Sequence, residues 1–237
     1  MKIIPIKTRI VKLPKDNIFD IFDNLEICDG DILAITSKII SIHQGRCIPI
    51  DSVKSKDDLI IKEADYFIPR KDVPGNAAVL TIKNSNLIAS AGIDENKSAG
   101  YYILLPDKPE KIAKEICLYL KKKFSLKKLA VIITDSHTIP LRFGVIGFSI
   151  GFFGLYPFVK YFDKNGEEII ASRVNIIDSL AAAAVLEMGE QSEQTPLAII
   201  RDAHNIKFTN EETFQQTVMA FEKDIYYPVL KNFKEDI

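Results

Sequence analysis

The stretch AVIITDS, residues 130–136, is an apolar run that stops abruptly at Asp135. A second apolar run, LIASAGID over residues 87–94, stops in the same way at Asp94. Runs of this kind predict buried strands, and packing fixes the end of a buried strand at the rim of its sheet. A carboxylate held there suits a hard metal ion, although an aspartate that follows a strand is also a common turn residue.

Other patterns predict helices and strands in an irregular order. Helices are expected at 109–123, at 178–188 before Gly189, from Ser55 towards Phe67, and after Thr209. Strands are expected at 32–35, 169–174 and 196–201. This mixture predicts the α+β class rather than a doubly wound sheet. Residues 1–237 are expected to form a single domain, either as one body or as two lobes with the site in the cleft between them.

The composition argues against several classes of function. With 31 Lys and Arg against 32 Asp and Glu, the net charge is −1, so no nucleic-acid partner is expected. Three cysteines without paired spacing argue against a disulfide framework or a zinc site and predict a cytoplasmic protein. Residues 143–159 carry no charge, but their glycines and Pro157 fit turns in a globular core, so no membrane partner is expected.

Neither usual phosphate-binding fingerprint occurs in the sequence. There is no GxxxxGK(S/T) loop and no GxGxxG after a first strand. A nucleotide site must therefore be assembled from scattered loops.

Several separated motifs occur in order along the chain. They are GDILAITSKIIS (30–41), GR (45–46), SAGIDEN (90–96), LLP (104–106), ITDS (133–136), AAAA (181–184) and MGE (188–190). Together, over about residues 28 to 201, they resemble the coenzyme F-420 γ-glutamyl ligase family. The resemblance implies a GTP-dependent, divalent-metal-dependent ligase that joins L-glutamate to a small carboxylate acceptor. It also implies a homodimer with the site in a cleft.

The resemblance assigns candidate site residues by position. The implied ligands of Mn²⁺ or Mg²⁺ are Asp94, Asp135, Ser136 and Glu190. The residues implied at the nucleotide, with GTP as co-substrate, are Ser37, Lys38, Asn96, Arg142, Met188, Gly189, Gln191 and Ser192. Taken alone, Glu190 fits a solvated residue after a helix end, and Lys38 and Arg142 fit surface ion pairs.

The assignment agrees with the chemistry of the implied reaction. A carboxylate is a poor electrophile and must become an acyl phosphate before an amine can displace it. Phosphoryl transfer from a nucleoside triphosphate to a carboxylate brings two anions together, and cations held by oxygen ligands neutralise that charge. Both GTP and ATP, and both magnesium and manganese, fit such a site.

Two positions depart from the family pattern. Ile42 stands where the family usually has a lysine, and Ile139 stands where an arginine usually follows the metal-binding aspartate. Losing a cation at each position should weaken binding of a phosphate or carboxylate, so a different acceptor is expected. A subgroup with this pattern is provisionally linked to folate metabolism, and the acceptor stays open.

Two other classes of function fit the same residues. A non-catalytic nucleotide- or metal-binding protein would keep the fold and lose ligase activity through Ile42 and Ile139. A structural protein would have no small-molecule site, and substitution of Asp94 or Asp135 would then change no metal affinity.

Overall fold

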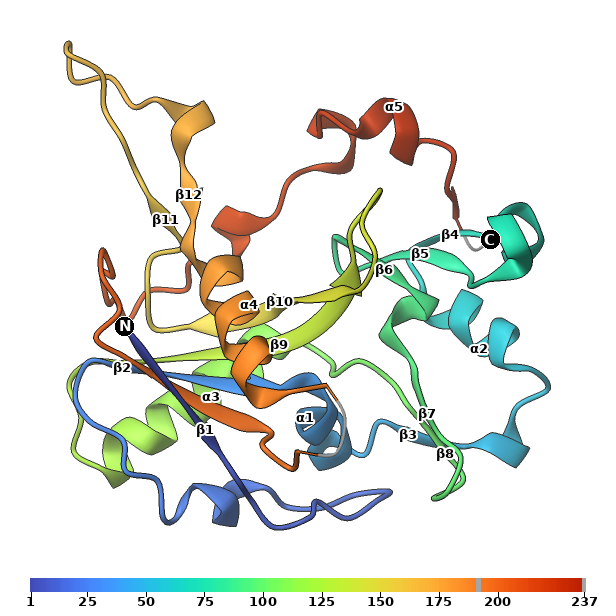
Figure 1. The fold of residues 1–237 in the computed structure, drawn as a ribbon, viewed down its shortest axis with the longest axis horizontal. Helices are drawn as coiled ribbons and strands as arrows, with labels where there is room; N and C mark the ends of the chain where they lie inside the picture. The colour runs from blue at the N-terminus through green and yellow to red at the C-terminus, as the bar shows by residue number, and fades with distance from the viewer. Residues whose placement is uncertain (191–192, 236–237) are drawn as a thin grey trace.

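The structure is a computed structural model that describes residues 1–190 and 193–235 (Figure 1). The largest sheet in the described chain has five strands, in the spatial order β1 (Lys2–Ile6), β13 (Leu197–Arg201), β2 (Asp31–Thr36), β9 (Leu129–Thr138) and β10 (Val145–Phe153). β2 and β9 run parallel, and the other neighbouring pairs are antiparallel. This sheet and the helices packed on it are called the main-sheet region.

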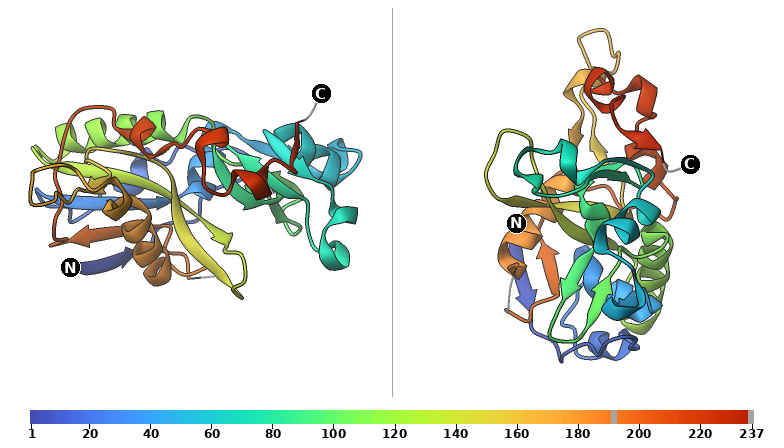
Figure 2. Two further views of the ribbon diagram at one scale, coloured as in Figure 1. Left: turned by 90° about the horizontal axis from the view of Figure 1, so that it is seen from above. Right: turned by 90° about the vertical axis from the view of Figure 1, so that its right-hand side faces the viewer.

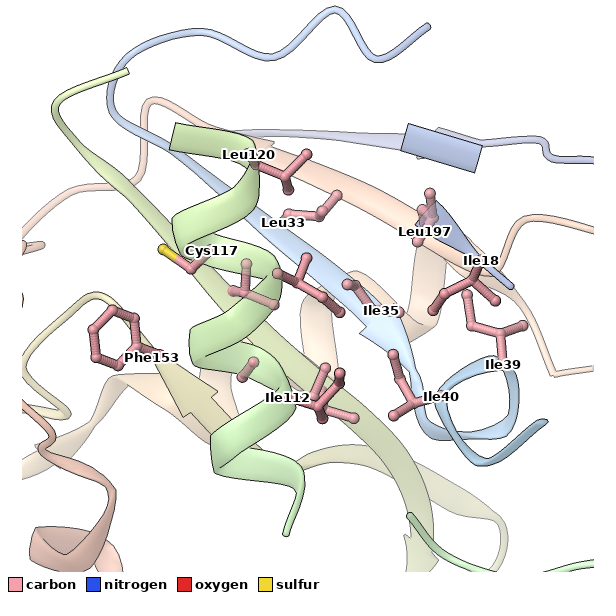
Figure 3. Packing of buried hydrophobic residues seen from close by; sticks show 14 of the residues in the cluster. Ile18, Leu33, Ile35, Ile39, Ile40, Ile112, Cys117, Leu120, Phe153 and Leu197 are labelled. Atoms are coloured by element: carbon pink, nitrogen blue, oxygen red, sulfur yellow. The ribbon is translucent and has the colours of Figure 1, made fainter. Parts of the chain in front are cut away.

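Helices α3 (Pro109–Lys123) and α4 (Ile176–Met188) cover opposite faces of the main sheet. Because side chains alternate along a strand, Leu33 and Ile35 of β2 belong to the cluster with α3, which Figure 3 shows. Ile32, between Asp31 and Leu33, belongs to the cluster with α4. Both faces of β2 are therefore buried, which explains why its sequence is a continuous apolar run.

A second unit, the small-sheet region (residues 46–104), is inserted between α1 (Ser37–Gln44) and α3. One of its sheets contains β3 (Cys47–Pro49), β8 (Tyr101–Ile103) and β7 (Asp94–Asn96). The other contains β4 (Tyr66–Ile68), β5 (Leu80–Lys83) and β6 (Asn86–Ala89). With α2 (Lys56–Glu63), these strands enclose a core of their own around Leu59 and Ile60. Figures 1 and 2 show this region beside the main-sheet region along the longest axis of the molecule.

The C-terminal segment, residues 203–235, passes from the main-sheet region back to the small-sheet region (Figure 1). Phe214 packs against Phe152 of β10, with ring centroids 5.8 Å apart. Further along, Phe221 stacks on Tyr66 at 4.9 Å, and β14 (Lys234–Glu235) pairs with β4. The two ends of this segment are thus fixed to different regions.

Shorter elements complete the described chain. They are β11 (Phe158–Val159), β12 (Val174–Asn175), α5 (Tyr227–Leu230) and the 3₁₀ helices Phe19–Phe22, Ile50–Ser52, Arg70–Asp72, Pro74–Asn76, Ser90–Gly92, Ile170–Ser172, Phe214–Thr217 and Phe221–Lys223.

The α+β class predicted from the sequence is confirmed, as are the helices at 109–123 and 178–188. Three local predictions were wrong. The helix after Ser55 ends at Glu63, because residues 66–68 pair in β4. Residues 170–172 form a 3₁₀ turn, and of the predicted strand only Val174 is in a strand, β12. The segment after Thr209 contains only short helical turns in place of a long helix.

In residues 1–190 and 193–235, every helix is too short or too polar to cross a membrane. The uncharged segment at 143–159 instead supplies β10 of the main sheet.

Candidate active site

The parallel pairing of β2 and β9 brings the first site residues together. Thr36 and Thr134 are partners in register, so the residues that follow them, Ser37 and Asp135, meet at the same edge of the sheet. The Ser37 hydroxyl donates a hydrogen bond of 2.6 Å to Asp135 Oδ2, and the backbone N–H of Ser136 donates one of 2.7 Å to Oδ1. The carboxylate is therefore held at both oxygens. The carboxyl edge of parallel strands is a common location for ligand sites.

The predicted strand ends need correction. Asp135 does not end its strand, because β9 continues to Thr138 by pairing with β10. The rim at Asp135 arises because the neighbouring strand, β2, stops at Thr36. Asp94 begins β7, and the 3₁₀ turn Ser90–Gly92 separates it from β6.

A cavity of about 540 Å³ lies next to these residues and receives side chains from both regions. Its lining comes from 8–11 and Leu13, from 36–39 and Ile42, from Asp94, Asn96 and Ile103, from 134–136, from Val185, from 188–190 and from 193–196. The volume is in the range typical of small-molecule sites. The cavity therefore collects segments that are distant in the sequence.

Asp135 has an unusual environment for an aspartate. The pKa of its carboxyl group is raised to about 6. Burial is the largest cause, and the nearby charge of Asp94 acts in the same direction, while hydrogen bonds from Ser37 and Ser136 and the charge of Lys38 act in the opposite direction. Asp94 and Asp135 line the same cavity. A carboxyl group with such a pKa is ionised at neutral pH and becomes protonated under mildly acidic conditions.

Three charged side chains, those of Lys38, Asp94 and Glu190, line the exposed rim of the cavity. Asp94 Oδ2 lies 2.8 Å from Lys38 Nζ, and both side chains are at least half exposed, at 56% and 50%. Glu190 accepts a hydrogen bond of 3.2 Å from the Ser136 hydroxyl. Glu190 follows Gly189, which ends α4 with φ 80° and ψ 168°, a conformation open essentially to glycine.

The oxygen atoms of the side chains at this end of the cavity are suitable ligands for a hard divalent cation. Carboxylates and hydroxyls are the oxygen ligands that magnesium and manganese prefer. Among residues 1–190 and 193–235, no three His, Cys, Asp or Glu side chains lie close enough together to hold a metal ion. Asp94 and Glu190 would have to turn from Lys38 and Ser136 towards Asp135 to share an ion. The metal assignment stays a prediction.

Most of the predicted site residues line this one cavity. They are Ser37, Lys38, Asp94, Asn96, Asp135, Ser136, Met188, Gly189 and Glu190. Arg142 is not among them and is exposed in the connection between β9 and β10. Figure 2 shows this hairpin projecting from the molecule. Gln191 and Ser192 lie outside the described residues.

Sequence reasoning missed one wall of the cavity. Residues 8–11 and Leu13 follow β1 and belong to no helix or strand, and Ile103 belongs to β8. These residues carry no motif and no periodicity. Only the folded chain brings them opposite α1.

Comparisons with known proteins show which sequences this chain resembles. A family model described as F420-0:Gamma-glutamyl ligase matches residues 5–202. The chain is similar to the coenzyme F420:L-glutamate ligase of Methanopyrus kandleri, with 29% identity over 85% of this chain and 86% of that protein. It is also similar to the proteins of the same name from Methanocaldococcus jannaschii (30% identity, 89% and 90%) and Methanothermobacter thermautotrophicus (32% identity, 74% and 76%).

The family match covers most of the chain and includes every candidate site residue. The expected enzyme class, a ligase of the γ-glutamyl type, is thereby confirmed. The chain belongs to the F420-0:gamma-glutamyl ligase family.

Proposed function

We propose that this protein joins the amino group of L-glutamate to a carboxylate of a small, coenzyme-like acceptor, using GTP and Mg²⁺ or Mn²⁺ and an acyl phosphate. The observation that carries the proposal is the convergence of Asp94, Asp135 and Glu190 on one cavity, next to Ser37 and Lys38. The names of the relatives support the glutamate-ligating reaction.

The proposed reaction has two steps. A carboxylate oxygen of the acceptor attacks the terminal phosphorus of GTP, and GDP leaves. The amine of glutamate then attacks the acyl carbon, inorganic phosphate leaves and the amine gives up a proton. Bound by these oxygens, a divalent cation would neutralise the negative charge that builds up between the triphosphate and the acceptor.

The N-terminus of α1 supports a phosphate at this position. Thr36, Ser37 and Lys38 line the cavity, and the N-cap residue Thr36 makes no side-chain hydrogen bond to the first turn. The first N–H groups of α1 have no partner within the helix and suit an anion. The Lys38 ammonium, now paired with Asp94, adds a positive charge that could shift to a phosphate oxygen.

A homodimer and a cytoplasmic location are part of the proposal. Leu141 and Phe143 at the tip of the β9–β10 hairpin are fully exposed, and Val145 is 54% exposed. Exposed apolar surface of this kind favours contact with another protein copy. Light scattering should give the mass of a dimer for the wild-type protein and a lower mass, towards that of a monomer, for Phe143→Ser. The three cysteines, Cys28, Cys47 and Cys117, are free, as the cytoplasm favours.

The test measures phosphate release and product mass with GTP, a divalent cation, L-glutamate and a panel of carboxylic acids. We expect release only when glutamate and an acid are both present, with ATP tested in parallel. Asp135→Asn should abolish it, whereas Asp51→Asn, an exposed aspartate outside the cavity, should not.

The competing candidate is a non-catalytic nucleotide- or metal-binding protein. It is favoured by Ile42, an apolar residue in the cavity lining at a position where the family resemblance implies a lysine. Binding of GTP without phosphate release for any acid in the panel would support this candidate and overturn the ligase proposal.

A further inference from the structure

The two end residues of the small-sheet region, Arg46 and Leu104, contact each other. The backbone N–H of Leu104 donates a hydrogen bond of 3.0 Å to the carbonyl oxygen of Arg46. Just outside the region, the Gln44 side-chain amide donates to the Asp107 carbonyl oxygen and accepts from the Asp107 N–H, at 2.8 Å each. The two segments that enter and leave the region are thus bonded to each other at one place, which we call the junction (residues 44–47 and 103–107).

The Arg46 side chain connects a third part of the molecule to the junction. Its Nε–H donates a hydrogen bond of 2.9 Å to the Leu105 carbonyl oxygen, and a terminal nitrogen forms an ion pair of 2.6 Å with Glu63, the last residue of α2. The Arg46 and Glu63 side chains are only 28% and 19% exposed, so solvent screens their attraction less than that of a fully exposed pair. One guanidinium therefore links the junction to α2.

The strand that carries Asp94 and Asn96, β7, is supported by both partners of Arg46. Within its sheet, β8 lies between β7 and β3, and β3 begins directly after Arg46 (Figure 1). From the core, Ile60 of α2 belongs to the same buried cluster as Ile93, the residue before Asp94. A shift of β8 or of α2 would therefore move the backbone of β7.

Other contacts between the two regions do not hold β7 as firmly. The ion pair of Asp94 with Lys38 is half exposed, and pairs of this kind contribute little. The C-terminal segment reaches the other sheet of the small-sheet region, at β4, and His137 Nδ1 lies 3.3 Å from the Leu87 carbonyl oxygen of β6, in that same sheet. The position of β7 relative to Asp135 thus depends mainly on the junction.

We propose that Arg46 is a positioning residue, which holds the backbone of β7, and with it Asp94 and Asn96, in place relative to Asp135. The Asp94 side chain can still turn towards a ligand. Where the inference concerns the reaction, it rests on the proposed function, because Asp94 would act there as a metal ligand. A lysine at position 46 would keep the charge but not the planar fork that reaches Glu63 and the Leu105 carbonyl together.

The distance between two spin labels tests the position of β7 directly. One label is attached to Cys28, which is exposed, and the other to Lys97→Cys, directly after β7, where the native side chain is 83% exposed. Cys47 and Cys117 are buried and their thiols have raised pKa values, so they react little, and mass spectrometry confirms two labels in each protein. Electron paramagnetic resonance should give a narrow distance distribution with the native Arg46.

Three variants at two arginines locate the effect. Arg46→Gln should make the distance distribution about twice as wide or wider, because the link between the junction and α2 is lost. Arg46→Lys should give an intermediate width, and it carries the same comparison if Arg46→Gln does not fold. Arg70→Gln is the matched control. Arg70 also binds a carboxylate of α2, that of Asp57, but its other partners are the carbonyl oxygens of 76–77, so the width should not change.

Glutamate-dependent phosphate release connects the position of β7 to the reaction. Arg46→Gln should lower kcat by about tenfold, because a misplaced ligand costs rate even when it is present. If Arg46 acts through Asp94, the double variant Arg46→Gln, Asp94→Asn should lose little more than Asp94→Asn alone. An arginine with a purely structural role would instead give losses that multiply.

Several outcomes would overturn the inference. They are an unchanged distance distribution in both Arg46 variants, the same widening in Arg70→Gln, an unchanged kcat despite a wider distribution, and losses that multiply in the double variant. The distance measurement uses no substrate. A wild-type protein that releases no phosphate, but whose narrow distribution widens in Arg46→Gln alone, would therefore reject only the proposed function.

Discussion

Asp135 and Asp94 reach the same cavity from regions that are built differently. Asp135 lies in the ten-residue strand β9, with hydrogen bonds to both carboxylate oxygens. Asp94 begins the three-residue strand β7 of the small-sheet region, and its side chain is 56% exposed with one ion pair to Lys38. The comparison indicates that the two regions contribute to the site in different ways. The main-sheet region preorganises its half of the site, whereas the half from the small-sheet region can adjust to a ligand.

The largest expected effect separates these two carboxylates. Asp135→Asn should lower glutamate-dependent phosphate release by about 10³-fold, because it removes a preorganised charge from the site of phosphoryl transfer. Asp94→Asn should lower it by about tenfold to a hundredfold, since the exposed Glu190 can compensate in part. Initial rates at saturating GTP measure both. Equal losses of phosphate release in the two variants would mean that the two halves of the site are equally preorganised.

The cores of the two regions should also differ in stability. Leu33 of the main sheet and Ile60 of α2 are both 0% exposed. Leu33→Ala should cost about 4 kcal/mol, because the surrounding cluster is fixed on all sides and leaves a cavity. Ile60→Ala should cost about 2 kcal/mol, because half-buried neighbours of the smaller cluster can move inward. Urea unfolding gives both values, and an equal cost would contradict the difference.

A third test compares one bidentate ion pair from each region. Arg201 donates to both oxygens of Asp31, whose side chain is 2% exposed. Asp31→Asn should cost about 3 kcal/mol, because a buried acceptor of a charged donor is lost. Arg70 holds Asp57 in the same geometry, but the Asp57 side chain is 37% exposed. Asp57→Asn should leave the urea midpoint nearly unchanged, and a loss as large as for Asp31 would refute this ranking.

The last test is the pH dependence of unfolding in the metal-free protein. The pKa of Asp135, about 6, exceeds the usual value of about 3.9 in an unfolded chain. Between these values the folded protein holds a proton that the unfolded chain has lost, so stability falls as the pH rises through this window. The fall is on the order of 3 kcal/mol. Asp135→Asn should remove it. Asp94→Asn should keep most of it, because burial is the largest cause of the raised pKa. A wild-type curve without the fall would contradict the expectation.

Much of the main-sheet region could be predicted from the sequence, because its local signals and its packing agree. The apolar runs at 32–35 and 130–134 are buried on both faces, and the helix patterns at 109–123 and 178–188 face them. The prediction failed where β9 leaves the core. Residues 135–138 are polar, yet they stay in the strand because β10 supplies partners.

For a related reason, only part of the candidate site could be predicted from the sequence. Ordered motifs indicated residues 37–38 and 188–190, which line the cavity. The lining residues Val11 and Leu13 could not be predicted, because they have no local sequence pattern and acquire their position only from packing against Ile42 and Ile103. Arg142 carries a charge suited to a phosphate, but the hairpin holds it in solvent. Sequence spacing contains no information on where a hairpin points.

The return of residues 203–235 to β4 means that the polypeptide connects the two regions three times, after α1, before α3 and after β13. A protease that cuts between α1 and β3 would leave one fragment with β1, β2 and α1 and a second fragment with the rest of the chain. The two should stay associated, because β1 and β2 pair with β13 and β9 of the second fragment. Such a nicked molecule should elute as one species from a sizing column and separate only in denaturant. Strand pairing in the main sheet thus makes the cavity resistant to this backbone break.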